Sequence, residues 1–130
     1  MQMIRSKDSK PEMIVRRFLF SKGYRYRLHD KKLPGKPDIV LKKYNTIILV
    51  HGCFWHGHSN CDNWKMPETN REYWSRKIGR NLLRDVRNQT ELMELGWNVI
   101  TIWECQLKPK VRSRTLEDLL FELQEIEKFL

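Results

Sequence analysis

The sequence predicts a single α/β domain in which helices cover a mixed β-sheet. Three observations support this prediction. The length of 130 residues suits one compact core, no repeat or linker divides the chain, and the apolar patterns indicate elements in the order α-β-β-β-α-β-α. Residues 1–130 are therefore expected to form one domain.

The first half of the chain predicts one helix and three strands. The helix begins at Pro11, continues with apolar residues at helical spacing, and ends at Gly23. A period-two alternation predicts a strand over 24–28, and short apolar runs predict strands over 39–41 and 46–50. Because the last run is continuous and β-branched, we expect this strand to be buried on both faces.

The second half predicts a long helix, one more strand and a final helix. The long helix is expected over 70–95, ended by Gly96. A strand is expected over 97–103, followed by a helix over 115–129 that Thr115 caps. The apolar face of the long helix is expected to consist of residues at i+4 spacing, namely Trp74, Ile78, Leu82 and Val86.

The charge balance indicates a polyanionic partner. Lys and Arg number 25 against 16 Asp and Glu, so the formal net charge is +9. Nucleic acid is the leading candidate and an anionic membrane surface the second. No apolar run approaches the roughly 20 residues that span a bilayer, and the N-terminus lacks the apolar stretch of a signal peptide. We expect a soluble, intracellular protein.

Three cysteines and a histidine have the spacing of a metal site. Cys53, His58 and Cys61 form C-x4-H-x2-C, and Cys105 follows the last predicted strand. An odd number of cysteines fits a disulfide framework poorly, whereas four such ligands complete a tetrahedral Cys3His zinc site with no open position for catalysis. A structural zinc would also order the aperiodic loop over 51–67. The alternative is that the cysteines are buried thiols and that His58 lies on the surface.

Carboxylates and histidines form a second candidate site. Asp38 at the mouth of a strand and Glu12 on the first helix could hold a hard Mg²⁺ ion that activates water; an ordinary turn aspartate is the alternative for Asp38. Many nucleases end the next strand with Glu-x-Lys, but here His51 stands in its place, with His56 nearby. These histidines could deprotonate water or protonate the leaving oxygen. The alternative is that one of them replaces His58 as a zinc ligand.

Aromatic and polar residues form a third group. Phe54 and Trp55 lie in the loop, and Trp74, Lys77 and Asn81 share one face of the long helix. Large apolar side chains on a stiff loop can wedge between base pairs, while Lys and Asn can hydrogen-bond base edges. The core is the expected place for two further tryptophans, Trp97 and Trp103.

Five short motifs stand in order along the chain. They are LPGKPD over 33–38, HGCFWH over 51–56, Trp74 with KIGRN over 77–81, LGW over 95–97 and WEC over 103–105. Together they resemble the very-short-patch (Vsr-type) mismatch endonucleases. The resemblance extends from about Arg5 to Leu107, and HGCFWH followed by WEC is its most specific part.

The resemblance implies a restriction-endonuclease-like fold and Mg²⁺-dependent nicking of one strand of double-stranded DNA. The cut would lie beside a T:G mismatch, which arises when 5-methylcytosine deaminates. Asp38 and the backbone carbonyl of Val50 would bind magnesium, and Glu12 would reach the metal through water. His56 would be the water-activating base, and His51 would assist at the phosphate.

The resemblance also assigns zinc and DNA contacts. Lys77 and Asn81 match positions that contact the mispaired bases, and Lys36 of the first motif is expected at the DNA. The protein is expected to be a monomer in the bacterial cytoplasm, associated with the nucleoid, with mismatch-repair proteins as candidate partners. The zinc ligands would be Cys53, His58, Cys61 and Cys105. The intercalating wedge would be Phe54, Trp55 and Trp74.

Two departures from the family pattern bear on function. Val50 stands where some relatives have Thr, and residues 1–10 form a shorter arm than the one that grips the minor groove in relatives. Met1 would have to replace an apolar groove contact, so weaker mismatch selectivity or DNA affinity is expected. Two other functions stay open: a restriction-like or homing-type nuclease acting on matched DNA, and a zinc-stabilised DNA-binding module without catalysis.

Overall fold

The computed structural model describes residues 9–59, 61–62 and 64–130. The predicted order of helices and strands is confirmed, with 3-10 turns η1 and η2 after β2 and β4. Of the predicted N-terminal arm, residues 1–8, including Met1, lie outside the described residues. The elements are α1 (Lys10–Ser21), β1 (Arg27–Leu28), β2 (Ile39–Leu41), η1 (Lys42–Tyr44), β3 (Thr46–His51), α2 (Arg71–Glu94), β4 (Asn98–Trp103), η2 (Glu104–Leu107) and α3 (Arg112–Glu127).

The four strands form one mixed sheet in the order β1-β2-β3-β4. The first three strands pair antiparallel, whereas β3 and β4 pair in parallel with His51 opposite Trp103. A parallel pair needs a long crossover, and α2 supplies it. Every residue of β3 except the half-buried Val50 is buried, as the continuous apolar run predicted.

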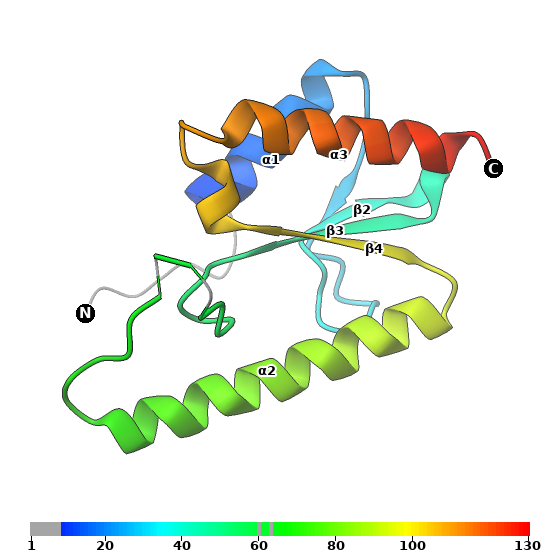
Figure 1. The fold of residues 1–130 in the computed structure, drawn as a ribbon. Coiled ribbons are helices and arrows are strands. Elements are labelled where there is room, and N and C mark those ends of the chain that lie inside the picture. Colours follow the sequence, from blue (N-terminus) through cyan, green and yellow to red (C-terminus); the bar gives the residue numbers. More distant parts are fainter. Residues whose placement is uncertain (1–8, 60, 63) are drawn as a thin grey trace.

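Helices cover both faces of this sheet (Figure 1). Helices α1 and α3 lie on one face and α2 lies on the other. The larger core, between the sheet and the α1/α3 layer, includes Val15, Leu19, Ile48, Ile102 and Leu123. The smaller core on the α2 side consists of Val40, Ile47, Leu49 and Leu92, with Trp97 packed against it as predicted.

The predicted apolar face of α2 is wrong beyond its first half. Trp74 is half-buried and Ile78 is buried, but Leu82 and Val86 are 42% and 64% exposed. The face that turns inward instead includes Asp85, which is half-buried. Helical spacing alone could not predict which face of α2 turns inward, because several apolar side chains of this helix face solvent.

Two loops that approach α2 closely explain its polar inner face. Gly35 and Gly57 both have positive φ, at 75° and 64°. A Cβ atom on Gly35 would lie 2.7 Å from Asn88 Nδ2, and one on Gly57 would lie 3.0 Å from Ile78 Cγ2. Glycine is therefore required at both places, by the backbone conformation and by the lack of space. Much of α2 packs against these loops and not against the sheet.

Two element boundaries also differ from the prediction. The strand expected over 24–28 is reduced to Arg27–Leu28, because Tyr24 turns into the core and its hydroxyl lies 2.8 Å from Glu127 Oε1. Helix α3 begins at Arg112 and its N-cap position is Val111, so Thr115 lies inside the helix and does not cap it. Among the described residues, none of the helices has the length and apolar character needed to cross a membrane.

Candidate metal centres and active site

The parallel pairing of β3 and β4 brings three of the cysteine and histidine motifs together. His51 and Trp103 are opposite each other in the sheet. Cys53 and Cys105 follow them by two residues each, so both leave the same end of neighbouring strands. The loop after β3 then returns His58 to this edge, where Cys105 Sγ lies 3.6 Å from His58 Nδ1.

The donor atoms of the predicted zinc ligands form one cluster. One donor atom from each of Cys53, His58, Cys61 and Cys105 lies within 4.8 Å of all the others. Tetrahedral Zn²⁺ with ordinary Zn–S and Zn–N bonds would set neighbouring S and N ligands about 3.6 Å apart. The spacing of Cys105 and His58 matches this value.

Burial raises the pKa of two of these thiols. The pKa of the fully buried Cys53 rises to about 12, and burial also raises the pKa of Cys105. Both thiols would therefore keep their protons at neutral pH in the absence of metal. A bound Zn²⁺ ion deprotonates thiol ligands outright, so this donor set fits zinc.

Trp103 contacts both His58 of the cysteine cluster and His51 of the neighbouring group. The prediction that Trp103 lies in the core is wrong. Its ring stacks on His58 with 4.1 Å between centroids and an interplanar angle of 11°. It also meets His51 edge to face at 5.2 Å. Trp103 is half-buried because it lies at the end of β4, where the sheet opens onto the loop after β3.

A second group consists of His51, His56 and Asp85. The two imidazole rings stack in parallel, with centroids 3.8 Å apart and an interplanar angle of 3°. His56 Nδ1 lies 2.6 Å from Asp85 Oδ2 on α2. Asp85 was not predicted as a site residue, although it lies on the same helical face as Asn81.

His51 is uncharged at neutral pH. Burial, followed by the charge of His56, lowers the pKa of His51 to about 4. Its Nδ1 is buried and finds no hydrogen-bond partner among the described residues. A buried nitrogen without a partner is costly, so His51 is available for an interaction with a bound group.

A third group surrounds Asp38. The Val50 N–H donates to Asp38 Oδ2 at 2.8 Å, which holds the carboxylate beside the residue that precedes His51. The pKa of Asp38 is raised to about 6, mainly by burial and also by the charge of Glu12. The hydrogen bond from Val50 and the charges of His29 and His56 lower this pKa. Both Glu12 and His56 therefore act electrostatically on Asp38.

Glu12 is a buried carboxylate on α1 that faces Asp38. Its Oε2 lies 3.3 Å from Arg16 Nη1 and 3.0 Å from His29 Nε2. Donor atoms of Glu12, His29 and Asp38 all lie within 4.8 Å of one another. Sequence reasoning placed Glu12 and Asp38 in one site but assigned no role to His29.

The three predicted wedge residues form an aromatic cluster. Ring centroids are 5.1 Å apart for Phe54 and Trp55, 5.5 Å for Phe54 and Trp74, and 5.7 Å for Trp55 and Trp74. All three side chains are half-buried. The Asn81 Nδ2 group donates to the Trp55 carbonyl at 2.9 Å, so α2 supports the backbone of this cluster.

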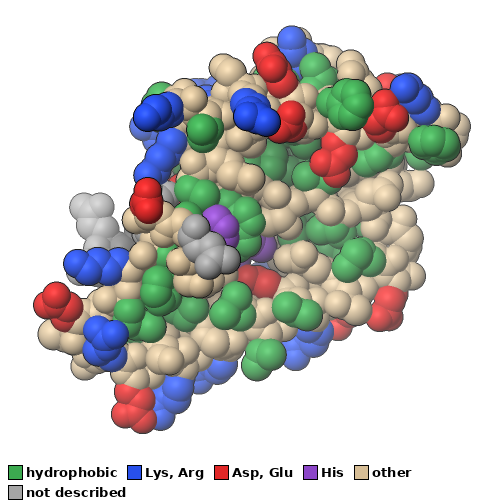
Figure 2. Space-filling model, in the orientation of Figure 1, with side chains coloured by type: hydrophobic (Ala, Val, Ile, Leu, Met, Phe, Trp, Pro, Cys, Tyr) green, Lys and Arg blue, Asp and Glu red, His purple; other side chains and the backbone are tan. Residues whose placement is uncertain are grey.

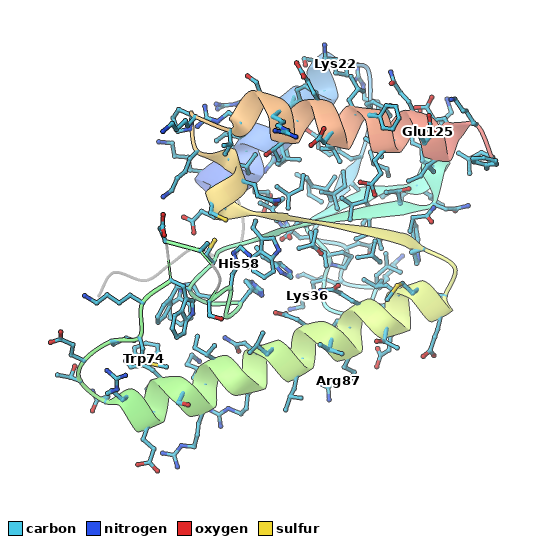
Figure 3. The ribbon with its side chains drawn as sticks, in the orientation of Figure 1. Lys22, Lys36, His58, Trp74, Arg87 and Glu125 are labelled. Carbon is cyan, nitrogen blue, oxygen red and sulfur yellow. The ribbon has the colours of Figure 1, made fainter. Side chains whose placement is uncertain are left out.

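Basic residues surround these groups. Lys36 is exposed on the loop that precedes Asp38 (Figure 3). Lys77 is half-buried on α2, three residues after Trp74. Figure 2 shows hydrophobic side chains around a histidine between α2 and the upper layer, with Lys and Arg along the outer edge of α2. A polyanion could contact both the basic edge and the aromatic cluster.

Comparison with known proteins identifies relatives that match most of the chain. Residues 1–63 match the family model described as DNA mismatch endonuclease Vsr. The type II nicking enzyme V.NmeAIP of Neisseria meningitidis serogroup A is 49% identical over 126 residues, covering 96% of this chain and 89% of the relative. The DNA mismatch endonuclease Vsr of Escherichia coli is 40% identical over 125 residues, covering 96% of this chain and 78% of the relative. The type II nicking enzyme V.XorIIP of Xanthomonas oryzae is 49% identical over 107 residues, covering 82% of this chain and 78% of the relative.

Proposed function

The chain belongs to the Vsr family of DNA mismatch endonucleases, and we propose that it nicks one strand of double-stranded DNA beside a T:G mismatch by Mg²⁺-dependent hydrolysis. The observation that carries this proposal is the meeting of two groups at the end of β3. Asp38 is hydrogen-bonded to Val50, and the next residue, His51, stacks on His56. A carboxylate that can bind a metal thus adjoins a histidine that can accept a proton.

The residues around Asp38 fit a divalent cation. Glu12 is a buried carboxylate and Asp38 a half-buried one, their oxygens lie close together, and repulsion by the charge of Glu12 contributes to the raised pKa of Asp38. A cation between them would relieve this repulsion. We assign Asp38 and the Val50 carbonyl as direct magnesium ligands and Glu12 as a ligand through water. When bound, Mg²⁺ supplies positive charge that stabilises the phosphate in the transition state.

His56 is the proposed general base. Because its Nδ1 is bound to Asp85, the nitrogen left for chemistry is Nε2. His56 Nε2 would accept a proton from the attacking water as the water oxygen bonds to phosphorus and the bond to the leaving oxygen breaks. The Asp85 carboxylate would hold the ring in place and stabilise the imidazolium that forms, as an aspartate does in a catalytic triad.

His51 would assist at the phosphate as a neutral ring. Its pKa of about 4 keeps it uncharged at neutral pH, so it can donate a hydrogen bond to a phosphate oxygen from one nitrogen. Its stacking on His56 holds the two rings at a fixed separation. The two histidines would therefore have separate roles: His56 would transfer the proton and His51 would orient the phosphate.

We propose that the aromatic cluster opens the mismatch. Phe54, Trp55 and Trp74 would insert between base pairs, which costs least where a mismatch already weakens stacking. Lys77 and Asn81 would contact the mispaired bases, and Lys36 would contact the DNA near the cut. The hydrogen bond from Asn81 to the Trp55 carbonyl supports a wedge that stays ordered before DNA binds.

The Cys3His cluster is proposed to hold a structural zinc. All four donors are engaged, so no position is left for substrate. Cys53 and His58 flank the wedge and base residues in sequence, and a metal bound there would fix the loop that carries Trp55 and His56. The relatives named as endonucleases and nicking enzymes favour an enzyme over the alternative of a non-catalytic binding module.

Cleavage of an end-labelled duplex with one T:G mismatch tests the proposed chemistry. Wild-type protein should nick the duplex with Mg²⁺ but not with EDTA, and Asp38→Asn should abolish nicking while DNA binding is retained. Asp118→Asn changes an exposed carboxylate on α3 in the same way and serves as the matched control. Equal nicking by Asp38→Asn and wild type would remove Asp38 from the reaction.

A further inference from the structure

His29 lies inside the proposed metal centre. Its Nε2 is 3.0 Å from Glu12 Oε1 and 3.0 Å from Glu12 Oε2. Donor atoms of His29, Glu12 and Asp38 are within 4.8 Å of one another. A ligand separation of this order needs only a small inward movement before Asp38 and His29 could both reach one ion at the usual distance of about 2.1 Å, with Glu12 bound through water.

The backbone directs His29 toward Asp38. Leu28 pairs with Ile39 in the antiparallel β1–β2 ladder, and the His29 N–H continues the pairing by donating to the Asp38 carbonyl at 3.1 Å. Residues directly opposite each other in an antiparallel pair project from the same face. At the end of this hairpin the side-chain donor atoms of His29 and Asp38 lie within 4.8 Å of each other.

His29 also has a strained backbone. Its φ is 47°, in the left-handed region that side chains with a Cβ atom rarely adopt. Such strain persists only where the surrounding structure imposes it, and it concentrates at functional sites. Here the hydrogen bonds of the His29 N–H and ring, to Asp38 and Glu12, hold the residue in place.

We propose that His29 is a third protein ligand of the catalytic ion, which makes this centre a mixed site that binds Mn²⁺ more tightly than Mg²⁺. This inference rests on the proposed function, which puts the ion at Asp38. Two carboxylates alone suit Mg²⁺, whereas an imidazole nitrogen favours first-row transition ions. Mn²⁺ accepts carboxylate oxygen and also gains from the nitrogen.

Binding of the ion would use the ring nitrogen of His29 that now contacts Glu12. His29 Nε2 lies 3.0 Å from Glu12 Oε1. With its proton on Nδ1, the ring would offer the Nε2 lone pair to the ion. Glu12 keeps its ion pair with Arg16 Nη1 at 3.3 Å.

The test measures Mn²⁺ binding directly on zinc-loaded, full-length protein without DNA. With protein in excess over Mn²⁺, electron spin echo envelope modulation detects nitrogen bound to the ion. Wild type should show ¹⁴N modulation, and both His29→Asn and His29→Gln should lose it. Asn tolerates the left-handed backbone, and Gln keeps a donor within reach of Glu12. His56→Gln should retain the modulation.

Dissociation constants provide the second measurement. His29→Gln should weaken Mn²⁺ binding by about tenfold or more and Mg²⁺ binding by less than about threefold. Zinc content and the thermal midpoint without Mn²⁺ show whether each variant is folded. The inference is wrong if wild type lacks ¹⁴N modulation, if the modulation survives in folded His29 variants, or if His56→Gln removes it.

Asp38→Asn separates this inference from the proposed function. If Mn²⁺ binding does not change in Asp38→Asn, the ion is not at Asp38 and the proposed metal centre fails together with the role of His29. If binding depends on Asp38 but not on His29, the proposed centre stands and only the ligand role of His29 is overturned.

Discussion

The His56 imidazole and the Asp85 carboxylate are joined by a hydrogen bond of 2.6 Å, although 29 positions separate the two residues. This contact links the loop after β3 to the middle of α2. It also decides which nitrogen of His56 can act on a substrate, because Nδ1 is bound to Asp85 whereas Nε2 has no hydrogen bond to any of the residues that the structure describes. The orientation of the proposed base therefore depends on a residue outside the loop that carries it.

Asp85→Asn should lower the rate of the nicking step more than it lowers DNA affinity. The amide still accepts a hydrogen bond from His56, but it no longer offsets the charge that His56 gains on accepting a proton. Because general-base catalysis contributes roughly 10²–10⁴ in rate, we expect a loss of at least about tenfold in the single-turnover rate. Rapid-quench cleavage and a binding titration, with Asp118→Asn as control, separate the two effects. A loss confined to DNA affinity would contradict the role of Asp85.

Asp38 should make the metal-free protein less stable at neutral pH than at acidic pH. Folding raises the pKa of Asp38 to about 6 from an ordinary value of 3.8, so the folded state binds the proton more tightly than the unfolded state. The contribution of Asp38 to stability is therefore largest below about pH 4 and is lost as the pH rises to about 6. Asp38→Asn removes this loss, and at pH 7.5 it should be more stable than wild type by on the order of 1–3 kcal/mol.

Urea unfolding at pH 4 and pH 7.5, without added Mg²⁺, measures this effect. The stability difference between Asp38→Asn and wild type should shrink at the lower pH, and Asp118→Asn should show no such dependence. Added Mg²⁺ should stabilise wild type at pH 7.5 but not Asp38→Asn. If Asp38→Asn were less stable than wild type at both pH values, burial of the charged Asp38 carboxylate would not destabilise the protein.

Cys105→Ser should cost the protein its zinc and much of its stability. Structural zinc in small domains supplies folding free energy on the order of 10 kcal/mol, and Cys105 is the proposed ligand whose contact with His58 joins the loop after β3 to the end of β4. Elemental analysis should give about one zinc per wild-type chain and far less in the variant. Full zinc retention with an unchanged thermal midpoint would exclude Cys105 from the site.

Trp55→Ala should reduce affinity for a mismatched duplex more than for a matched one. Loss of the ring removes a side chain that would stack between bases, and this matters most where the mismatch is opened. The matched control is Phe121→Ala, an exposed aromatic on α3 that is far in sequence from the cluster. Fluorescence anisotropy with both duplexes gives the ratio of affinities. Equal losses on both duplexes would mean that Trp55 only packs within the loop.

The fold was largely predictable because its signals are local. The continuous run over 46–50 predicted the buried strand, and Gly96 predicted the end of α2 within one residue of its cap at Leu95. The inner face of α2 was not predictable, because it is set by the close approach of loops at Gly35 and Gly57. The residue pattern of α2 does not indicate which loops will pack against the helix.

The candidate site divides in the same way. Cysteine spacing placed Cys53, His58, Cys61 and Cys105 together, and the structure brings their donor atoms within 4.8 Å of one another. Asp85 and His29 were missed, because each becomes a site residue only through tertiary contact with His56 or Glu12. A carboxylate on a charged helix and a histidine near a turn are ordinary residues until the fold supplies their partners.

Strand-resolved nicking of matched and T:G-mismatched duplexes, with both strands end-labelled, tests the central claim most directly. Wild type with Mg²⁺ should cut only the strand that carries the mispaired T, next to the mismatch, and should leave the matched duplex intact under the same conditions. Equal cutting of the matched duplex, or of both strands, would contradict a mismatch-directed nicking enzyme and favour a restriction-like one.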